Sequence, residues 1–326
     1  SGLVLGWLMF AIFLTGSLSF YRQEISLWMR PELLAGYSPG QPPSAQALQA
    51  AQRTAAQAAQ WSLRLPDERD PTLTLQWRPS GEQQRPQTLR LHPQTGEVFT
   101  PRETMGGDFF YRFHFELRTA QNGRWVLQGR WVVGVATLLM FIALLSGIVT
   151  HRRIFKDFFT LRPGKNAQRA WLDAHNLSGV LVLPFYLMIT FSGLMIFHSL
   201  YLPAGIAAAY PGPSGNDAAH YLAQLRGEPT DLRLRPERDT PAPPLGELDL
   251  AHWLAVSTQR STHPIALLQA YRNPQGQPMV EAVVTDHARL QYRPERLVWD
   301  ARSGTLAHHL DAAGPAVRTY GVLYGL

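Results

Sequence analysis

The stretch WVVGVATLLMFIALLSGIVT at residues 131–150 has no charged side chain and ends directly before His151. A basic connection, RRIFKDFFTLRPGKNAQRAWLD, leads toward His175, and a second apolar run, NLSGVLVLPFYLMITFSGLMIF, ends before His198. Each run is long enough to cross the ~30 Å hydrocarbon core of a bilayer as a helix that rises about 1.5 Å per residue. The sequence therefore predicts two membrane helices with histidines at their ends.

Charge is distributed unevenly along the chain, which has 326 residues and a formal net charge of +6. Much of the excess lies at 152–169, between the two apolar runs. Lys and Arg beside membrane spans mark the cytoplasmic side, so this loop predicts orientation and not nucleic-acid binding. A further span is predicted at residues 2–20, and the stretch from Tyr320 indicates the start of another. We expect the protein to continue beyond both ends of this chain.

Several kinds of chemistry are excluded by what the sequence lacks. It has no cysteine, so disulfides, thiolate metal sites, iron–sulfur ligation and covalent haem attachment cannot form within this chain. It has no Gly-x-Gly-x-x-Gly, no phosphate-binding Gly-x-x-x-x-Gly-Lys, no His-Glu-x-x-His and no Gly-x-Ser-x-Gly. A redox function would therefore require an external electron donor, such as quinol or a cytoplasmic reductase.

Two polar blocks follow outward spans, and each reads as a helix followed by strands that alternate apolar and polar residues. Ser44 is the predicted N-cap of the first helix. The predicted elements are a helix at 44–61 with strands at 72–77 and 87–93, then a helix at 248–259 with strands at 265–272, 279–286 and 296–300. Similar turns close the two blocks, PQTGEV and ARSGTL. The repeat predicts two modules of similar construction.

Two other stretches are distinctive. The segment DFFYRFHFEL at 108–117 is rich in aromatic residues, carries His114 and is predicted to lie at the outer membrane surface, where aromatic residues gather. Residues 203–247 are rich in Pro and Gly and are predicted to be an irregular linker.

Three stretches resemble the PepSY-associated transmembrane family, and within it the inner-membrane ferric-siderophore reductases. They are GLVLGWLMFAIFLTGSLSFYRQEI at 2–25, HRRIFKDFFTLRP at 151–163 and LDAHNLSGV at 172–180. The resemblance implies an α+β membrane protein, with a transmembrane bundle of three spans plus the start of a fourth and two periplasmic PepSY-like helix-plus-strands modules. It also implies a bacterial inner-membrane location with large periplasmic portions.

The predicted boundaries follow from the spans, the charges and this resemblance. They are a transmembrane helix at 1–21, a periplasmic PepSY-like module at 22–128, a transmembrane helix at 129–151, a cytoplasmic basic loop at 152–172, a transmembrane helix at 173–199, a second periplasmic PepSY-like module at 200–319 and the start of a fourth transmembrane helix at 320–326.

Histidines are the candidate cofactor ligands, because imidazole is a common axial ligand of haem iron. His151 and His175 lie at the cytoplasmic ends of consecutive antiparallel helices and are predicted to ligate an inner haem. His198 is 23 residues beyond His175, about 34 Å along a helix, so it belongs to an outer haem. Its predicted partner is His114 or a residue beyond Leu326. At least two b-type haems are therefore predicted, while the remaining histidines are interpreted as surface residues.

The resemblance implies that electrons pass outward through these haems to a ferric siderophore. Phe197, Tyr201 and Tyr320 are the predicted substrate contacts near the outer haem. Two other functions stay open, namely a non-redox scaffold that binds a partner through its modules, and a transporter of iron chelates. A transporter is expected to have polar or broken segments at the bilayer midplane, whereas these spans are almost wholly apolar, with Pro184 as the one candidate break.

Overall fold

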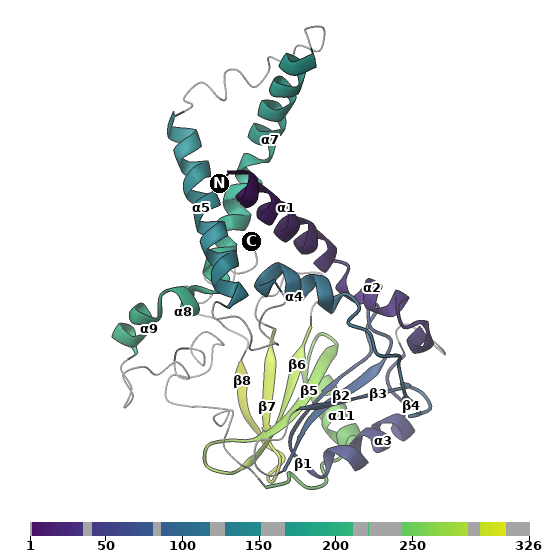
Figure 1. Cartoon of the computed structure of the whole chain (residues 1–326). Helices are drawn as coiled ribbons and strands as arrows, with labels where there is room; N and C mark the ends of the chain where they lie inside the picture. The colour runs from purple at the N-terminus through teal and green to yellow at the C-terminus, as the bar shows by residue number, and fades with distance from the viewer. Residues whose placement is uncertain are drawn as a thin grey trace. The chain divides into compact units, whose positions relative to one another are not determined.

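The computed structural model describes residues 2–34, 41–80, 86–117, 128–150, 167–210, 221, 243–285 and 294–310. These residues form two compact units, a helical unit and a sheet unit (Figure 1). The helical unit is built from the residues up to Phe20 and from Asp108–Pro203. The sheet unit is built from Tyr21–Gly107 and from the described residues that follow Pro203.

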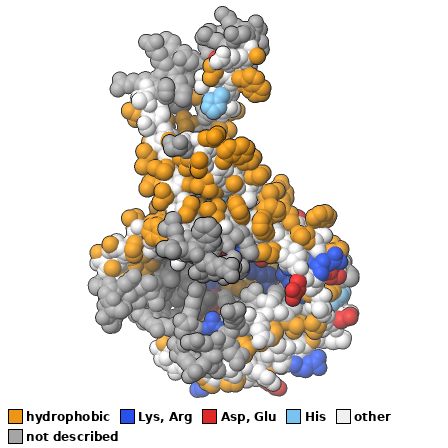
Figure 2. Space-filling view, in the orientation of Figure 1, with side chains coloured by type: hydrophobic (Ala, Val, Ile, Leu, Met, Phe, Trp, Pro, Cys, Tyr) orange, Lys and Arg blue, Asp and Glu red, His pale blue; other side chains and the backbone are white. Residues whose placement is uncertain are grey.

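The helical unit contains three helices that are long and apolar enough to cross a membrane, as the sequence predicted. They are α1 (Gly2–Ser19), α5 (Gly129–Thr150) and α7 (Ala167–Ile196). Only 11%, 17% and 22% of the residues in their apolar windows are buried. Hydrophobic side chains consequently cover most of the visible surface of this unit (Figure 2), which suits contact with lipid.

Two details of the helical unit differ from the sequence-based expectation. α7 begins at Ala167, six residues before the predicted boundary at 173, because the preceding residues are also good helix formers. α7 also continues through Pro184, the candidate break. The aromatic segment forms its own helix, α4 (Asp108–Glu116), which packs against α1 and α5.

The sheet unit consists of one sheet and several helices. Its helical segments are α2 (Arg22–Trp28), η1 (Pro31–Leu34), α3 (Ala45–Ala55), α9 (Pro203–Ala209, from Ala204 on) and α11 (Leu250–Arg260). Its strands are β1 (Ala58–Arg64), β2 (Leu73–Pro79), β3 (Gln87–Leu91), β4 (Val98–Phe99), β5 (Ile265–Arg272), β6 (Pro278–Val284), β7 (Arg296–Asp300) and β8 (Leu306–Leu310).

The eight strands form a single antiparallel sheet in the order β4-β3-β2-β1-β5-β6-β7-β8. Each half is a helix followed by four strands, and the halves join where β1 pairs with β5, with Leu63 opposite Leu268. The order is symmetric about this seam, so the two halves are related by an approximate twofold axis. The main core lies between the sheet and the helices α3 and α11, and includes Leu48, Trp61 and Trp253.

The closing turns of the two halves have the same hydrogen bonds, which supports the predicted repeat. Gly96 N–H donates to His92 O at 2.9 Å, and Gly304 N–H donates to Asp300 O at 2.9 Å. Both glycines have a φ of +72°, a left-handed conformation that favours glycine. The His92 ring accepts two turn N–H groups through Nδ1, and Asp300 Oδ1 does the same in the second half. The repeat is thus visible in backbone and side-chain atoms.

The predicted helix at 44–61 is wrong over its last six residues. Ser44 caps α3 as predicted, since its Oγ accepts from Ala47 N–H at 3.1 Å, but the helix ends at Ala55. From Ala58 the chain is a strand at the centre of the sheet, with Trp61 buried in the core. Burial in a sheet has overridden the helix propensity of Ala and Gln. The short strands β4 and β8 and the helix at Pro203–Ala209, inside the predicted linker, were also not predicted.

Candidate functional site

The His114 ring lies against the backbone of α1. His114 Nδ1 is 2.8 Å from the carbonyl oxygen of Ile12. Among the residues of α1 that the structure describes, only Ile12 and Thr15 are buried, and α4 packs against this helix. The contact needs a residue without a side chain at position 16, because a Cβ on Gly16 would lie 2.8 Å from both Cε1 and Nδ1 of His114.

This contact fixes the protonation pattern of the neutral ring. A carbonyl oxygen only accepts hydrogen bonds, so Nδ1 of His114 must carry the proton and donate it to Ile12 O. In the neutral imidazole, Nε2 then carries the lone pair. Metal-binding histidines are typically held in this way, with one ring nitrogen donating to a carbonyl and the other facing the metal.

His198 has the same kind of anchor. α7 ends at Ile196, and His198 is the first residue of the short helix α8 (His198–Tyr201). His198 Nδ1 donates to the carbonyl of Met195 at 2.7 Å, which satisfies one of the last carbonyls of α7. Its neutral ring is therefore also fixed with the lone pair on Nε2.

Aromatic rings connect the surroundings of the two histidines. Phe115, next to His114, contacts Phe197, next to His198, with ring centroids 5.5 Å apart. The His114 and Phe115 rings are 4.8 Å apart. This contact joins residues 82 positions apart in the sequence and brings α4, which carries His114, and the segment with His198 to the same end of the helical unit (Figure 1). A shared role of the two histidines as ligands stays a prediction.

A charged pair lies beside these rings. Arg130, near the start of α5, forms a 3.1 Å ion pair with Glu116, which is buried at the end of α4. The Arg130 guanidinium also lies 5.6 Å from the centroid of the Phe197 ring, within cation–π range. The pair therefore links α4, α5 and the residue before His198.

Two of the three predicted substrate contacts lie in this cluster. Tyr201 packs on Phe197 and on Trp131, at centroid distances of 6.1 and 5.4 Å, and its hydroxyl donates to Arg130 O at 2.9 Å. Burial raises the pKa of Tyr201, and the charge of Arg130 opposes that rise. The hydroxyl therefore stays protonated as a donor at neutral pH. The third predicted contact, Tyr320, lies outside the described residues, and the substrate role of all three stays a prediction.

The predicted inner pair is seen only in part. His175 is exposed on the early part of α7, and its carbonyl accepts from Ser178 Oγ at 3.0 Å. His151 lies outside the described residues, so the pairing of His151 with His175 stays a prediction.

Two other described histidines make contacts within the sheet unit. His92 caps a turn, and His309 Nε2 is 2.8 Å from Glu295. Within the described residues, no group of three or more His, Asp or Glu side chains is arranged to hold a metal ion.

The chemistry of these two residues fits the haem that the sequence resemblance implies. Two imidazoles, each with Nδ1 donating to a backbone carbonyl, would be able to hold the iron of a haem. Gly16 provides the space that His114 occupies, and the rings of Phe115 and Phe197 give an apolar surround. Sequence reasoning missed the role of Gly16, and it missed Arg130 and Glu116, which are ordinary charges until α4 is placed against α5.

These features define an α+β membrane protein with several candidate spans and a histidine pair at one end of its helical unit. The chain matches the family described as the PepSY-associated TM region over residues 1–326, and it therefore belongs to that family. No curated protein matches the chain.

Proposed function

We propose that the chain is a b-type haem protein of the bacterial inner membrane that reduces the ferric iron of a siderophore on the periplasmic side. The observation that carries the proposal is the pair His114 and His198, whose Nδ1 atoms donate to Ile12 O at 2.8 Å and Met195 O at 2.7 Å. When Nδ1 of each neutral ring donates to a carbonyl, the lone pair lies on Nε2, the nitrogen that could bind a haem iron.

In this proposal the histidines hold and orient a haem, which supplies one-electron chemistry when bound. The chain itself contributes ring orientation, an apolar surround and the Arg130–Glu116 pair, which leaves Arg130 beside Phe197. His151 and His175 are proposed to serve an inner haem in the same way, and the electron donor is quinol or a cytoplasmic reductase.

Reduction serves iron release because siderophores bind iron through hard oxygen ligands. Such ligands hold Fe(III) much more tightly than Fe(II), so adding one electron to the iron weakens the complex and frees the metal. The electron ends on the iron, and the chelator leaves unchanged.

The polar groups inside the spans support this function over transport. Thr15, Thr190 and Ser192 are buried, and their hydroxyls donate to carbonyls of their own helices. In the described spans, these hydroxyls are thus satisfied locally and do not line a polar path at mid-membrane, as a transporter of iron chelates would require.

Haem content is the first test. The full chain expressed with ample haem should show a Soret band, and His198→Ala should lower the haem-to-protein ratio and stop reduction of an external ferric chelate. His175→Ala should lower the ratio while leaving haem at the outer site. His263→Ala, an exposed residue of the sheet unit, is the matched control and should change neither. A wild-type chain without a Soret band, or a His198→Ala variant with full haem and full activity, would contradict the proposal.

Topology is the second test. Reporter fusions at Gly81, in the first polar block, and at Gly164, in the basic loop, should report opposite sides of the membrane. The same compartment for both would exclude a periplasmic site of reduction built as proposed.

A further inference from the structure

The sheet has two faces of different chemistry. The helices α3 and α11 cover one face, where Leu63, Leu75 and Leu268 are fully buried in the main core. Because side chains alternate along a strand, the residues between these point to the opposite face. On that face, residues paired across neighbouring strands form a continuous polar row: Thr88, Gln76, Ser62, Gln269 and Glu281.

On β6 and β7, the charged side chains of this face form an ion pair with each other. Glu281 is fully buried, forms a 2.5 Å ion pair with Arg296 and accepts from Gln269 at 3.3 Å. Arg296 is 8% exposed. A buried charge that is paired and hydrogen-bonded in this way is a structural element and offers little to a ligand.

The half on β1, β2 and β3 is partly open and carries excess positive charge. Gln76, Thr88 and Arg64 are exposed, whereas Thr74, on the same face, is buried. Within the described residues Arg64 has no ion pair, and it lies in register with Thr74 and, one strand further, with Arg90. The backbone positions of the two arginines therefore lie two strand intervals apart, about 10 Å.

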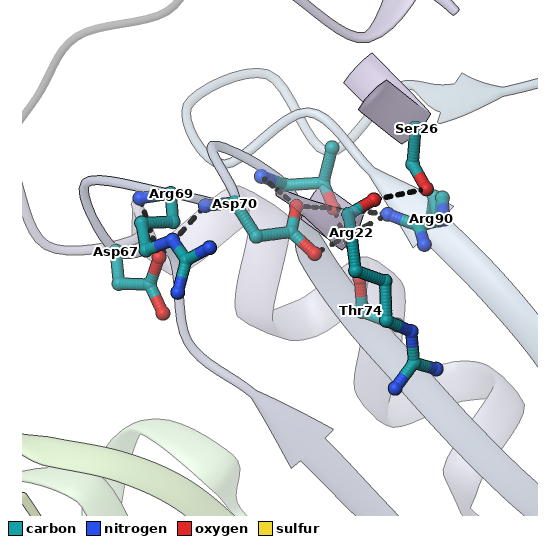
Figure 3. A network of polar contacts seen from close by, with 8 residues as sticks. Arg22, Ser26, Asp67, Arg69, Asp70, Thr74 and Arg90 are labelled. Carbon is teal, nitrogen blue, oxygen red and sulfur yellow. Dashed lines mark hydrogen bonds and ion pairs between the residues drawn. The ribbon is translucent and has the colours of Figure 1, made fainter. Parts of the chain in front are cut away.

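Arg90 is held in place by its neighbours. It forms a 3.4 Å ion pair with Asp70 and donates to Thr72 Oγ1 at 3.1 Å (Figure 3). Asp70 in turn accepts from the Thr72 hydroxyl at 2.7 Å. This network orders Arg90 beside the row, and Asp70 offsets only part of the positive charge there.

We propose that this open half of the sheet binds an anionic, carboxylate-bearing ferric chelate, an inference that rests on the proposed function. The polar surface is defined by Ser62, Arg64, Gln76, Thr88, Arg90 and Gln269. Arginine pairs with carboxylates through two parallel hydrogen bonds, while amide and hydroxyl groups donate to the remaining oxygens. The row from Thr88 to Gln269 crosses four strands, about 14 Å, which matches the width of a small chelate.

The binding test uses gallium(III) citrate, which carries the charge of the iron chelate but is not reduced. Binding to the full chain in detergent is measured by isothermal titration calorimetry, so the result does not depend on electron transfer. Gallium citrate should bind, and raising the salt concentration should weaken binding because exposed charges are screened. Neutral ferric acetohydroxamate should bind at least tenfold more weakly.

Matched variants locate the site. Arg64→Glu should weaken gallium citrate binding about tenfold or more, because it reverses a charge at the surface. Arg53→Glu makes the same change at an exposed position of α3, the helix that covers the opposite face, and should leave affinity within about twofold. Both residues are exposed, so both variants are expected to fold, which circular dichroism checks.

Equal affinities for the two variants, or no binding of gallium citrate by the wild-type chain, would overturn the inference. These results are separable from failure of the proposed function. A chain without a Soret band that still binds gallium citrate in an Arg64-dependent way would defeat reduction and leave the binding surface standing. A wild-type chain that reduces ferric chelates, together with an Arg64→Glu variant that binds gallium citrate with normal affinity, would defeat the binding surface and leave the proposed reduction standing.

Discussion

Replacing Gly16 with alanine is expected to displace His114. The new Cβ would lie 2.8 Å from Cε1 and Nδ1 of the His114 ring. Ordinary contacts between such atoms are about 3.5–4.0 Å, so the ring must retreat by about 1 Å. The bond from Nδ1 to Ile12 O, now 2.8 Å long, would then exceed the usual limit of about 3.2 Å.

The stability of the protein should hardly change. Loss of one hydrogen bond costs about 0.5–1.5 kcal/mol. Alanine inside a helix is favoured over glycine by about 0.5–1 kcal/mol, which offsets most of that loss. The ring is the end of a flexible side chain and moves without shifting the backbone. The melting temperature should therefore stay within a few degrees of the wild-type value, while the site is lost.

The assay compares Gly16→Ala with Gly6→Ala, a change on the same helix where no other atom lies within 4 Å of the new Cβ. In haem-free protein, the rate at which diethylpyrocarbonate modifies His114, followed by mass spectrometry, should rise for Gly16→Ala only. In haem-loaded protein, the haem-to-protein ratio should fall for Gly16→Ala only. If the two variants behave alike in both measurements, the missing side chain at position 16 does not position His114.

The sheet unit offers two further predictions. Gly107→Ala should lower the free energy of unfolding by about 2–4 kcal/mol, because the new Cβ would overlap the backbone of Arg22, which cannot move aside. Denaturant unfolding measures this change. Gly205→Ala is the control, because nothing lies within 4 Å of its Cβ. The Arg69 hydrogen bond holds the pKa of Glu24 below its usual value, so this pair stabilises the fold at pH values above the ordinary glutamate pKa, and its contribution is lost as pH falls through the folded-state pKa. Since both side chains are about half exposed, Arg69→Gln should cost only a few tenths of a kcal/mol at pH 6 and less at pH values where Glu24 is protonated, as unfolding curves at the two pH values will test.

The membrane helices could be predicted because their signal is local. A long uninterrupted apolar run is compatible with few structures other than a membrane helix, so α1, α5 and α7 can be predicted from composition alone. The repeat of a helix, strands and a Thr/Ser-Gly turn is also local, and the turns around Gly96 and Gly304 show it in detail. The conformation of each turn is determined by a few residues next to it in the sequence.

The joining of the two halves into one sheet could not be predicted in this way. The pairing of Trp61 with Ala270 connects strands that are about 200 positions apart, and nothing near either residue specifies the partner. The same tertiary contact explains why α3 ends early. Burying Ala58 and Trp61 in the sheet stabilises the fold more than a longer helix would. Strand register is likewise what revealed the polar surface, whose members look unremarkable in sequence.

The rings of His114 and His198 are held in place with few polar residues. A membrane helix uses its backbone polar groups internally, and adding side-chain partners within the bilayer is costly. Here each ring is instead anchored on a helix carbonyl, at Ile12 beside Gly16 and at Met195 where α7 ends. The His114 contact needs a residue without a side chain at position 16, and the His198 contact needs the end of α7. Neither feature stands out in the sequence, but together they fix the orientation of two imidazoles without a second polar side chain.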